Sequence, residues 1–302
     1  MLIRLASALS VMTLAACGGG AMSPSPNGLP RTGNLPNVLP QSGQGNSGGV
    51  VANGAPAAGV EATMRYNRIS GRASGARVDF HNGDLAGVSV TCGRAGGGAT
   101  VPECEAVNAD SAWLVNELSG NYAYAGAFAV NGHGPNGSED SFVAIHSGPG
   151  MNDAEDTILP GESVDYRGQF QAGASLIENG VQYEGRATGG MDLTADFTSG
   201  TLSASFDGQL RDADDNVYVD LAAGFEDAVI GPDGRFYNTD GTLFSYNGAQ
   251  AWGELDGDFY GPNAEETAGT FGFGNGSGGM TGIMLGCSEY NAANCVAPSP
   301  RF

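Results

Sequence analysis

The sequence predicts an all-β protein, and three observations support this fold class. Glycine is very abundant, at 51 of 302 residues, yet no Gly-X-Y period exists, which excludes a collagen-like fibre. Many short segments alternate apolar and polar residues, the pattern of strands with one buried face. Glycine, proline, asparagine and serine separate these segments at short intervals, as expected for antiparallel strands joined by turns.

The best-defined strand pair lies in residues 252–273, WGELDGDFYGPNAEETAGTFGF. One face of its first strand is small or apolar, and the other is acidic or aromatic. The two sets are Gly253, Leu255, Gly257 and Phe259, and Glu254, Asp256, Asp258 and Tyr260. Because side chains alternate faces along a strand, we expect the first set to face a core and the second to face water. Glycine alternating with aromatic residues favours a closed, strongly curved sheet, since a large ring fills the space beside a missing side chain.

From residue 163 onward the alternating segments are numerous enough for a closed barrel. The clearest hairpin joins two of them through the short loop at residues 198–200. Eight antiparallel strands close into a barrel whose interior side chains fill it, and polar outward residues favour a soluble barrel over a porin. The expected strands are 163–170, 183–188, 191–197, 201–207, 217–222, 242–247, 252–260 and 268–274, with 280–286 as a ninth or a replacement.

Before residue 160 further segments predict a smaller antiparallel sheet. Residues 121–130, NYAYAGAFAV, are apolar or aromatic for most of their length and should form a central strand. The other expected strands are 76–80, 87–91, 113–118 and 141–147.

The sequence of residues 259–271, FYGPNAEETAGTF, closely resembles the characteristic motif near the end of the β-barrel domain of transferrin-binding protein B and its lipoprotein relatives. The residues that carry the resemblance are Phe259, Tyr260, Gly261, Pro262, Asn263, Ala264, Glu265, Glu266, Gly269 and Phe271. The resemblance implies one lobe of that family, a small handle-like sheet followed by an eight-stranded barrel. It also implies capture of a protein or iron-bearing ligand, with a TonB-dependent transporter as a partner. No ligand-binding residues are carried over, because the family's contacts come from variable loops.

The N-terminal segment predicts export and lipid anchoring. Residues 1–16 read as a signal peptide, with Arg4 before an apolar core too short to span a bilayer permanently. Leu14, Ala15, Ala16 and Cys17 resemble a bacterial lipobox, so Cys17 is the expected site of acylation, with several acyl chains giving stable anchoring. The alternative is ordinary secretory cleavage. No Asp follows Cys17, which resembles lipoproteins of the outer membrane.

Composition then divides the rest of the chain. Residues 17–62 are rich in Gly, Pro, Ser and Asn and read as a flexible tether with a mean reach of roughly 30–40 Å. We expect a handle-like β domain over 63–160, the barrel over 161–287 and a C-terminal tail over 288–302.

Four cysteines remain after Cys17, and an even number in an exported chain predicts disulfides. Three pairings are open. We expect Cys92–Cys104 and Cys287–Cys295, because they close the smallest loops. A metal site is the alternative, although no C-x-x-C motif supports one.

No motif of catalysis or cofactor binding is present, so an enzyme is not expected and no cofactor is assigned. His133 and His146 flank one loop and could form a pair, and they are read as sheet or loop histidines. Residues 212–216, DADDN, resemble the start of a Ca²⁺ loop, but Val217 replaces the required glycine, so a solvated turn is expected. Glu265 and Glu266 are read as solvated charges on an exposed turn.

The charge of the chain excludes nucleic acid as a partner. There are 33 acidic residues against 12 basic ones, all of them arginine, and such a surface repels phosphate. The sequence therefore predicts a lipid-anchored outer-membrane or surface lipoprotein that captures a ligand without catalysis. Two alternatives stay open, an envelope lipoprotein with a structural or adhesive role and a lipocalin-like barrel for a small ligand.

Overall fold

The computed structural model describes residues 41–47, 50–52, 55–57, 60–69, 72–81, 85–93, 103–133, 139–148, 163–212, 214–232, 234–261 and 264–289. All nineteen elements in these ranges are β-strands, which confirms the all-β class. They form two sheets, called here the N-terminal sheet, β1–β10, and the barrel, β11–β19. No helix in the described ranges could span a membrane.

The N-terminal sheet is an antiparallel, curled sheet in the order β1-β4-β5-β6-β7-β8-β9-β10-β2-β3. The predicted central strand is confirmed, because β9 pairs with β8 on one side and β10 on the other. The strands are β1 (Gln41–Ser47), β2 (Val50–Ala52), β3 (Ala55–Ala57), β4 (Val60–Ile69), β5 (Arg72–Phe80), β6 (Ser89–Cys92), β7 (Glu103–Val107), β8 (Ser111–Ser119), β9 (Tyr124–His133) and β10 (Glu139–Ser147).

Strands β1, β2 and β3 lie inside residues 17–62, where the composition predicts a flexible tether. Their pairing explains the difference: β1 pairs with β4 and β2 with β10 through main-chain groups, which any residue type supplies. The composition predicts a tether because the segment has few apolar residues, and such a criterion cannot detect strands of this kind.

The barrel is a nine-stranded antiparallel sheet that closes on itself. Strands β15 and β16 both lie between β14 and β17, so they share one position and the cylinder has the eight predicted positions. The strands are β11 (Ser163–Glu178), β12 (Val181–Asp196), β13 (Thr201–Arg211), β14 (Val217–Ile230), β15 (Arg235–Tyr237), β16 (Leu243–Tyr246), β17 (Ala249–Tyr260), β18 (Glu266–Asn275) and β19 (Gly278–Ser288).

One detail of the expected barrel is wrong, the division of β12 into two strands, and the segment 280–286 is the predicted replacement. The segments 183–188 and 191–197 are one strand, β12, which continues through Gly189 and Gly190 in register with β11. A side chain at Gly189 would collide with the backbone of β13, so this glycine marks close approach of two strands and no turn. The segment 280–286 belongs to β19, which pairs with both β18 and β11 and closes the cylinder.

Aromatic rings fill the barrel interior. Phe206 lies at the centre of this ring cluster, with ring centroids 5.3 Å from Phe170 and 5.0 Å from Phe271. Phe259 contacts Tyr166 and Phe236, each at 5.4 Å. All six rings are less than 2% exposed, as expected for a barrel plugged by its own side chains.

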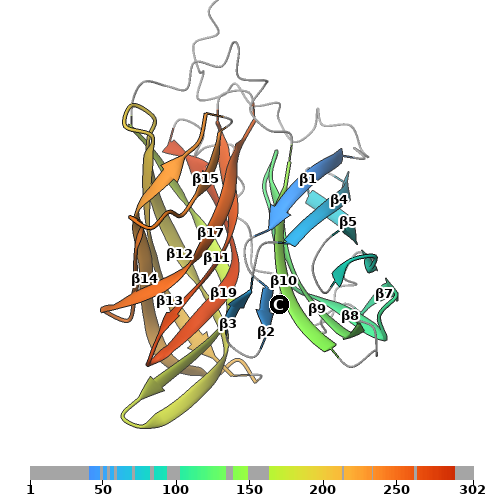
Figure 1. Ribbon diagram of the computed structural model, residues 1–302, viewed down its shortest axis with the longest axis horizontal. Helices are drawn as coiled ribbons and strands as arrows, with labels where there is room; N and C mark the ends of the chain where they lie inside the picture. The colour runs from blue at the N-terminus through green and yellow to red at the C-terminus, as the bar shows by residue number, and fades with distance from the viewer. Residues whose placement is uncertain are drawn as a thin grey trace, which may run out of the picture.

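The two sheets pack against each other (Figure 1). Small side chains on the barrel-facing side of β9 and β10, such as Ala125 and Ala144, contact Ile283 and Leu285 on the outer face of β19. This shared apolar layer places the ends of β17 and β18, which carry the family-like motif, at the contact between the sheets.

Candidate functional site

The motif of residues 259–271 spans the connection from β17 to β18, and Pro262 and Asn263 lie outside the described residues. Phe259 and Phe271 point into the barrel core. Gly261 and Ala264 have φ values of 87° and 55°, the left-handed region in which a tight turn uses glycine. A side chain at Gly269 would contact the Met284 methyl and the Phe236 ring, so that position needs glycine for packing.

Glu266 is completely buried, which corrects the expectation of a solvated charge. Its carboxylate accepts hydrogen bonds from the backbone N–H groups of Asn121 at 2.6 Å, Tyr122 at 2.9 Å and Ala123 at 2.8 Å. These three residues form the turn between β8 and β9. A carboxylate on the barrel therefore caps a turn of the N-terminal sheet, and a side chain at Gly120 would collide with it.

Tyr166 on β11 holds the same connection from the barrel side. Its hydroxyl donates a hydrogen bond of 2.9 Å to the backbone carbonyl of Ala264. Burial, and secondly the negative charge of Glu265, raise the pKa of Tyr166 well above its usual value. The hydroxyl consequently stays protonated and keeps its role as a donor.

A second polar cluster lies between β10 and β17, and it corrects the expectation that the acidic face of residues 254–260 meets water. His146 is fully buried, and its Nδ1 lies 2.6 Å from the Tyr260 hydroxyl while its Nε2 lies 3.4 Å from Asp256 Oδ2. Arg235 donates to Asp256 Oδ1 at 2.6 Å. Asp258 lies 3.9 Å from His146 Nδ1. The N-terminal sheet covers this face, which sequence alternation alone cannot foresee.

The electrostatics of Asp256 follow from these contacts. Burial raises its pKa, but hydrogen bonds and charge from His146 and Arg235 outweigh burial, so the pKa lies below the usual value. Asp256 is therefore ionised in a site that is 8% exposed. Glu254 lies two residues earlier, and burial raises its pKa without a partner that lowers it.

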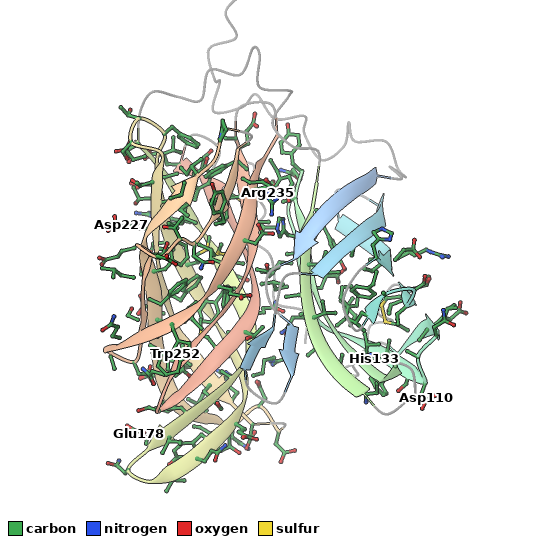
Figure 2. The ribbon with its side chains drawn as sticks, viewed as in Figure 1. Asp110, His133, Glu178, Asp227, Arg235 and Trp252 are labelled. Carbon is green, nitrogen blue, oxygen red and sulfur yellow. A yellow bond between two sulfur atoms is a disulfide. The ribbon has the colours of Figure 1, made fainter. Side chains whose placement is uncertain are left out.

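The remaining candidate residues are dispersed. His133 pairs in register with Glu139 at one end of the β9–β10 hairpin, whereas His146 pairs with Ala125 near the other, so they form no pair. Figure 2 shows His133 on the side of the N-terminal sheet away from the barrel. Within the described ranges no cluster of His, Cys, Asp and Glu could hold a metal ion.

The acidic run at 212–216 forms a solvated turn between β13 and β14, as predicted. A hydrogen bond from the Asn216 side chain to Asp212 lowers the pKa of this carboxyl group, and hydrogen bonds from the backbone of Asn216 and Asp214 to its Oδ1 lower the pKa further. Asp215 pairs with Arg186 at 3.4 Å.

The predicted disulfide between Cys92 and Cys104 is confirmed. Cys287 is also disulfide-bonded. Cys295 lies outside the described residues, so the pairing of Cys287 with Cys295 stays a prediction. Cys17 and the signal peptide lie outside them as well.

The motif residues, together with Asp256 on the strand before them, thus lie at the contact between the two sheets. They join two sheets through buried polar contacts made by Glu266, Tyr260 and Asp256. Sequence reasoning singled out this segment and missed its partners, His146, Arg235 and the turn at 121–123. No sequence signal separates this acidic face from a solvated one, because other outward faces of the barrel also carry aspartates, such as Asp165, Asp192 and Asp207.

Residues 159–291 match the family model of the C-lobe and N-lobe β-barrels of Tf-binding protein B. No curated protein matches the chain.

Similar solved structures include the N-lobe domain of lactoferrin-binding protein B from Moraxella bovis, at 15% identity and a TM-score of 0.34, covering 58% of this chain and 80% of that one. Transferrin-binding protein B from serogroup B Neisseria meningitidis has 14% identity and a TM-score of 0.37, covering 84% and 58%. HpuA from Kingella denitrificans, in complex with human haemoglobin, has 13% identity and a TM-score of 0.35, covering 87% and 92%.

The barrel motif, the closed cylinder of eight positions and the match over residues 159–291 lead to one conclusion. Residues 159–291 contain a β-barrel domain that matches the C-lobe and N-lobe barrels of Tf-binding protein B.

Proposed function

We propose that this protein is a lipid-anchored binding protein of the bacterial outer membrane or cell surface, which captures a protein or iron-bearing ligand without catalysis. The observation that carries the proposal is the match of residues 159–291 to the barrels of a transferrin-binding protein. The captured ligand would be passed to a TonB-dependent transporter.

The geometry of the site supports a binding role over a catalytic one. The polar groups that could do acid–base work, His146 and Asp256, are buried between the two sheets and engaged with Tyr260 and Arg235. A general base must reach its substrate within hydrogen-bond distance, and a buried, satisfied cluster offers no such access. Its effect is to fix the N-terminal sheet on the barrel as a preorganised surface.

The anchoring part of the proposal rests on the sequence. Cleavage after residue 16 and acylation of Cys17 would tie the chain to lipid. We propose a tether from residue 17 to 62, a handle-like domain over 63–160, the barrel over 161–287 and a tail over 288–302. Strands β1–β3 in the last part of the tether would then join the handle-like domain.

A small-ligand role of the lipocalin type is less well supported. A lipocalin-like site needs an open interior, and a cavity of several hundred Å³ is typical of such ligands. Here Phe206, Phe271 and the rings around them occupy the barrel axis.

Protease shaving of intact cells tests surface display. We expect release of the folded region from cells that express the wild-type chain, and loss of membrane association when Cys17→Ser is introduced. Recovery of the Cys17→Ser variant in the membrane fraction would contradict the lipid anchor.

Affinity capture tests the binding role. The purified protein, immobilised and exposed to serum or to extract of the native habitat, should retain a protein or an iron-bearing ligand. Retention of no enriched component in either medium would leave the structural or adhesive envelope role as the better explanation.

A further inference from the structure

A groove of about 460 Å³ crosses the outer face of the barrel, near the end that carries the long β11–β12 hairpin. Five neighbouring strands contribute one residue each to a single transverse row. Trp252 on β17 pairs with Gly274 on β18, which pairs with Gly279 on β19. Gly279 in turn pairs with Ser175 on β11, and Ser175 pairs with Glu184 on β12. All five residues line the groove.

The side chains of this row point outward. Ala172 and Leu176 belong to the barrel core, so Ser175 lies on the opposite face of β11. Ala251 and Leu255 are core residues of β17, which places Trp252 outside as well. Its indole is 64% exposed, the largest exposed fraction among the large hydrophobic residues of the described ranges (Figure 2). An indole usually contributes its large apolar area to a core or an interface, so this exposure indicates a contact surface.

The length of the row suits an extended occupant. Adjacent strands lie about 4.8 Å apart, so four steps from Trp252 to Glu184 span roughly 19 Å. An extended peptide covers about 3.3 Å per residue, and roughly six residues therefore match this distance. The glycines at 274 and 279 leave the middle of the row without side chains, so an occupant can approach the backbone.

Gly173 keeps a second part of the groove open without being required by the fold. It lies on the same outward face of β11, two residues before Ser175, and a Cβ atom added there would have no other atom within 4 Å. By contrast, a side chain at Gly274 would collide with the Gly278 carbonyl. The empty space above Gly173 is therefore available to an occupant.

Charge defines the chemistry of that occupant. Among the described residues that line the groove, Glu184 is the only charged one, and the chain carries a formal net charge of −21. Arg186, the neighbouring outward residue on β12, is paired with Asp215 at 3.4 Å. A cation gains from the negative face of an indole and from a carboxylate, and a strongly negative surface raises its local concentration.

We propose that this groove binds an extended basic segment of a partner protein, with one arginine or lysine side chain stacked on Trp252 and a second paired with Glu184. The proposal rests on the proposed capture function and specifies what the captured protein must present at its surface.

A peptide titration tests the proposal. Trp113→Phe leaves Trp252 as the sole tryptophan, so its fluorescence reports directly on the groove. The probe is the hexapeptide acetyl-RSGGSR-amide, which should change the emission in a saturable manner. Trp252→Ala should weaken binding of the peptide by about threefold to thirtyfold. Because this variant lacks the indole signal, its affinity is measured by calorimetry. Glu184→Gln should weaken it by about twofold to fivefold.

Two glycine variants separate groove binding from general attraction to an acidic protein. Gly173→Leu fills the groove without changing charge and should abolish the saturable signal. Gly190→Leu is the matched control, because Gly190 is exposed on β12, has no atom within 4 Å of a built side chain and does not line the groove. It should bind the probe like the parent protein.

Three results would overturn the proposal: unchanged binding by Gly173→Leu, equal binding of the acidic peptide acetyl-ESGGSE-amide, or stronger binding of a neutral sugar such as maltose. The last would assign the exposed indole to carbohydrate. If affinity capture retains a partner equally on the wild-type and Gly173→Leu proteins, the groove proposal fails while the capture function stands.

Discussion

Glu266 is the residue that most directly connects the two sheets. Its carboxylate accepts three backbone N–H groups from the β8–β9 turn while the side chain itself is fully buried. Hydrogen bonds to a charged acceptor are about twice as strong as neutral ones, and buried donors left unpaired are costly. The carboxylate thus offsets the desolvation of its own charge with three backbone donors of the β8–β9 turn.

Replacing this carboxylate by an amide tests its role. Glu266→Gln keeps the size of the side chain but turns an NH₂ group toward backbone N–H donors, so we expect a loss of about 1–3 kcal/mol in the free energy of unfolding. Urea denaturation measures the change. Glu226→Gln, at an exposed position of β14, is the control and should stay within about 0.5 kcal/mol of the wild type. Equal effects of the two variants would show that the three hydrogen bonds contribute nothing.

At the scale of elements, β13 forms the centre of the aromatic packing. Phe206 contacts rings from β11, β14 and β18, so four strands of the cylinder meet at one side chain. Loss of such a ring leaves a cavity that the surrounding sheet can fill only partly.

Phe206→Ala should therefore lower the free energy of unfolding by about 3–5 kcal/mol. Trp252→Ala removes an equally large aromatic group from the outer face and should change stability by no more than about 0.5 kcal/mol. Both values come from urea denaturation followed by circular dichroism. A Phe206→Ala variant as stable as Trp252→Ala would show that the rings do not form the core.

The disulfide between Cys92 and Cys104 links the end of β6 to β7 in the N-terminal sheet. A closed loop of this size restricts the unfolded chain, so Cys92→Ala together with Cys104→Ala should cost about 2–3 kcal/mol. Limited proteolysis should then cut the N-terminal sheet sooner while cleavage of the barrel stays unchanged. A uniform increase of cleavage in both sheets would instead show that they unfold together.

Alternation predicted the strands of the barrel well, because their core faces carry apolar side chains, such as Phe206 on β13 and Phe271 on β18. It predicted two strands where the structure has the single strand β12, because Gly189 indicates a turn in the sequence but permits close contact with β13 in the structure. It missed β1–β3, whose pairing depends on main-chain groups. It also placed Glu266 and Asp256 in water, because period two distinguishes the two faces of a strand and says nothing about a second sheet that covers the outer one.

At the scale of the whole molecule, the contact between the sheets is polar as well as apolar. Asp256 on the barrel meets His146 from the N-terminal sheet and Arg235 from β15. Since these partners lower its pKa, the ionised form belongs to the assembled state.

The sign of the resulting pH dependence follows. A carboxylate with a lowered folded-state pKa adds stability above its unfolded value, near 3.8, and loses that contribution as the pH falls through its folded-state pKa. We expect the melting temperature of the wild type to decrease when the pH is lowered below about 4. Asp256→Asn should be less stable at neutral pH and should show a shallower fall.

Glu254→Gln is the control on the same face of β17. Burial raises the pKa of Glu254, so its ionised form is disfavoured in the folded protein and its contribution has the opposite sign. Thermal melts between pH 2.5 and pH 7 should therefore show a steeper acid fall for this variant. A parallel shift of both variants would indicate that Asp256 does not titrate through its contact with His146.

The seam between β11 and β19 has a consequence for how the molecule is made. Tyr166 on β11 pairs with Ser288 on β19, so the first strand of the cylinder can complete its pairing only after the last strand is available. Pairings so distant along the polypeptide form slowly, and an unclosed cylinder exposes unpaired strand edges on which other chains can aggregate. During synthesis the N-terminal sheet can assemble first, whereas the cylinder stays open until the last strand, β19, is available. Protection by chaperones would matter most in that interval.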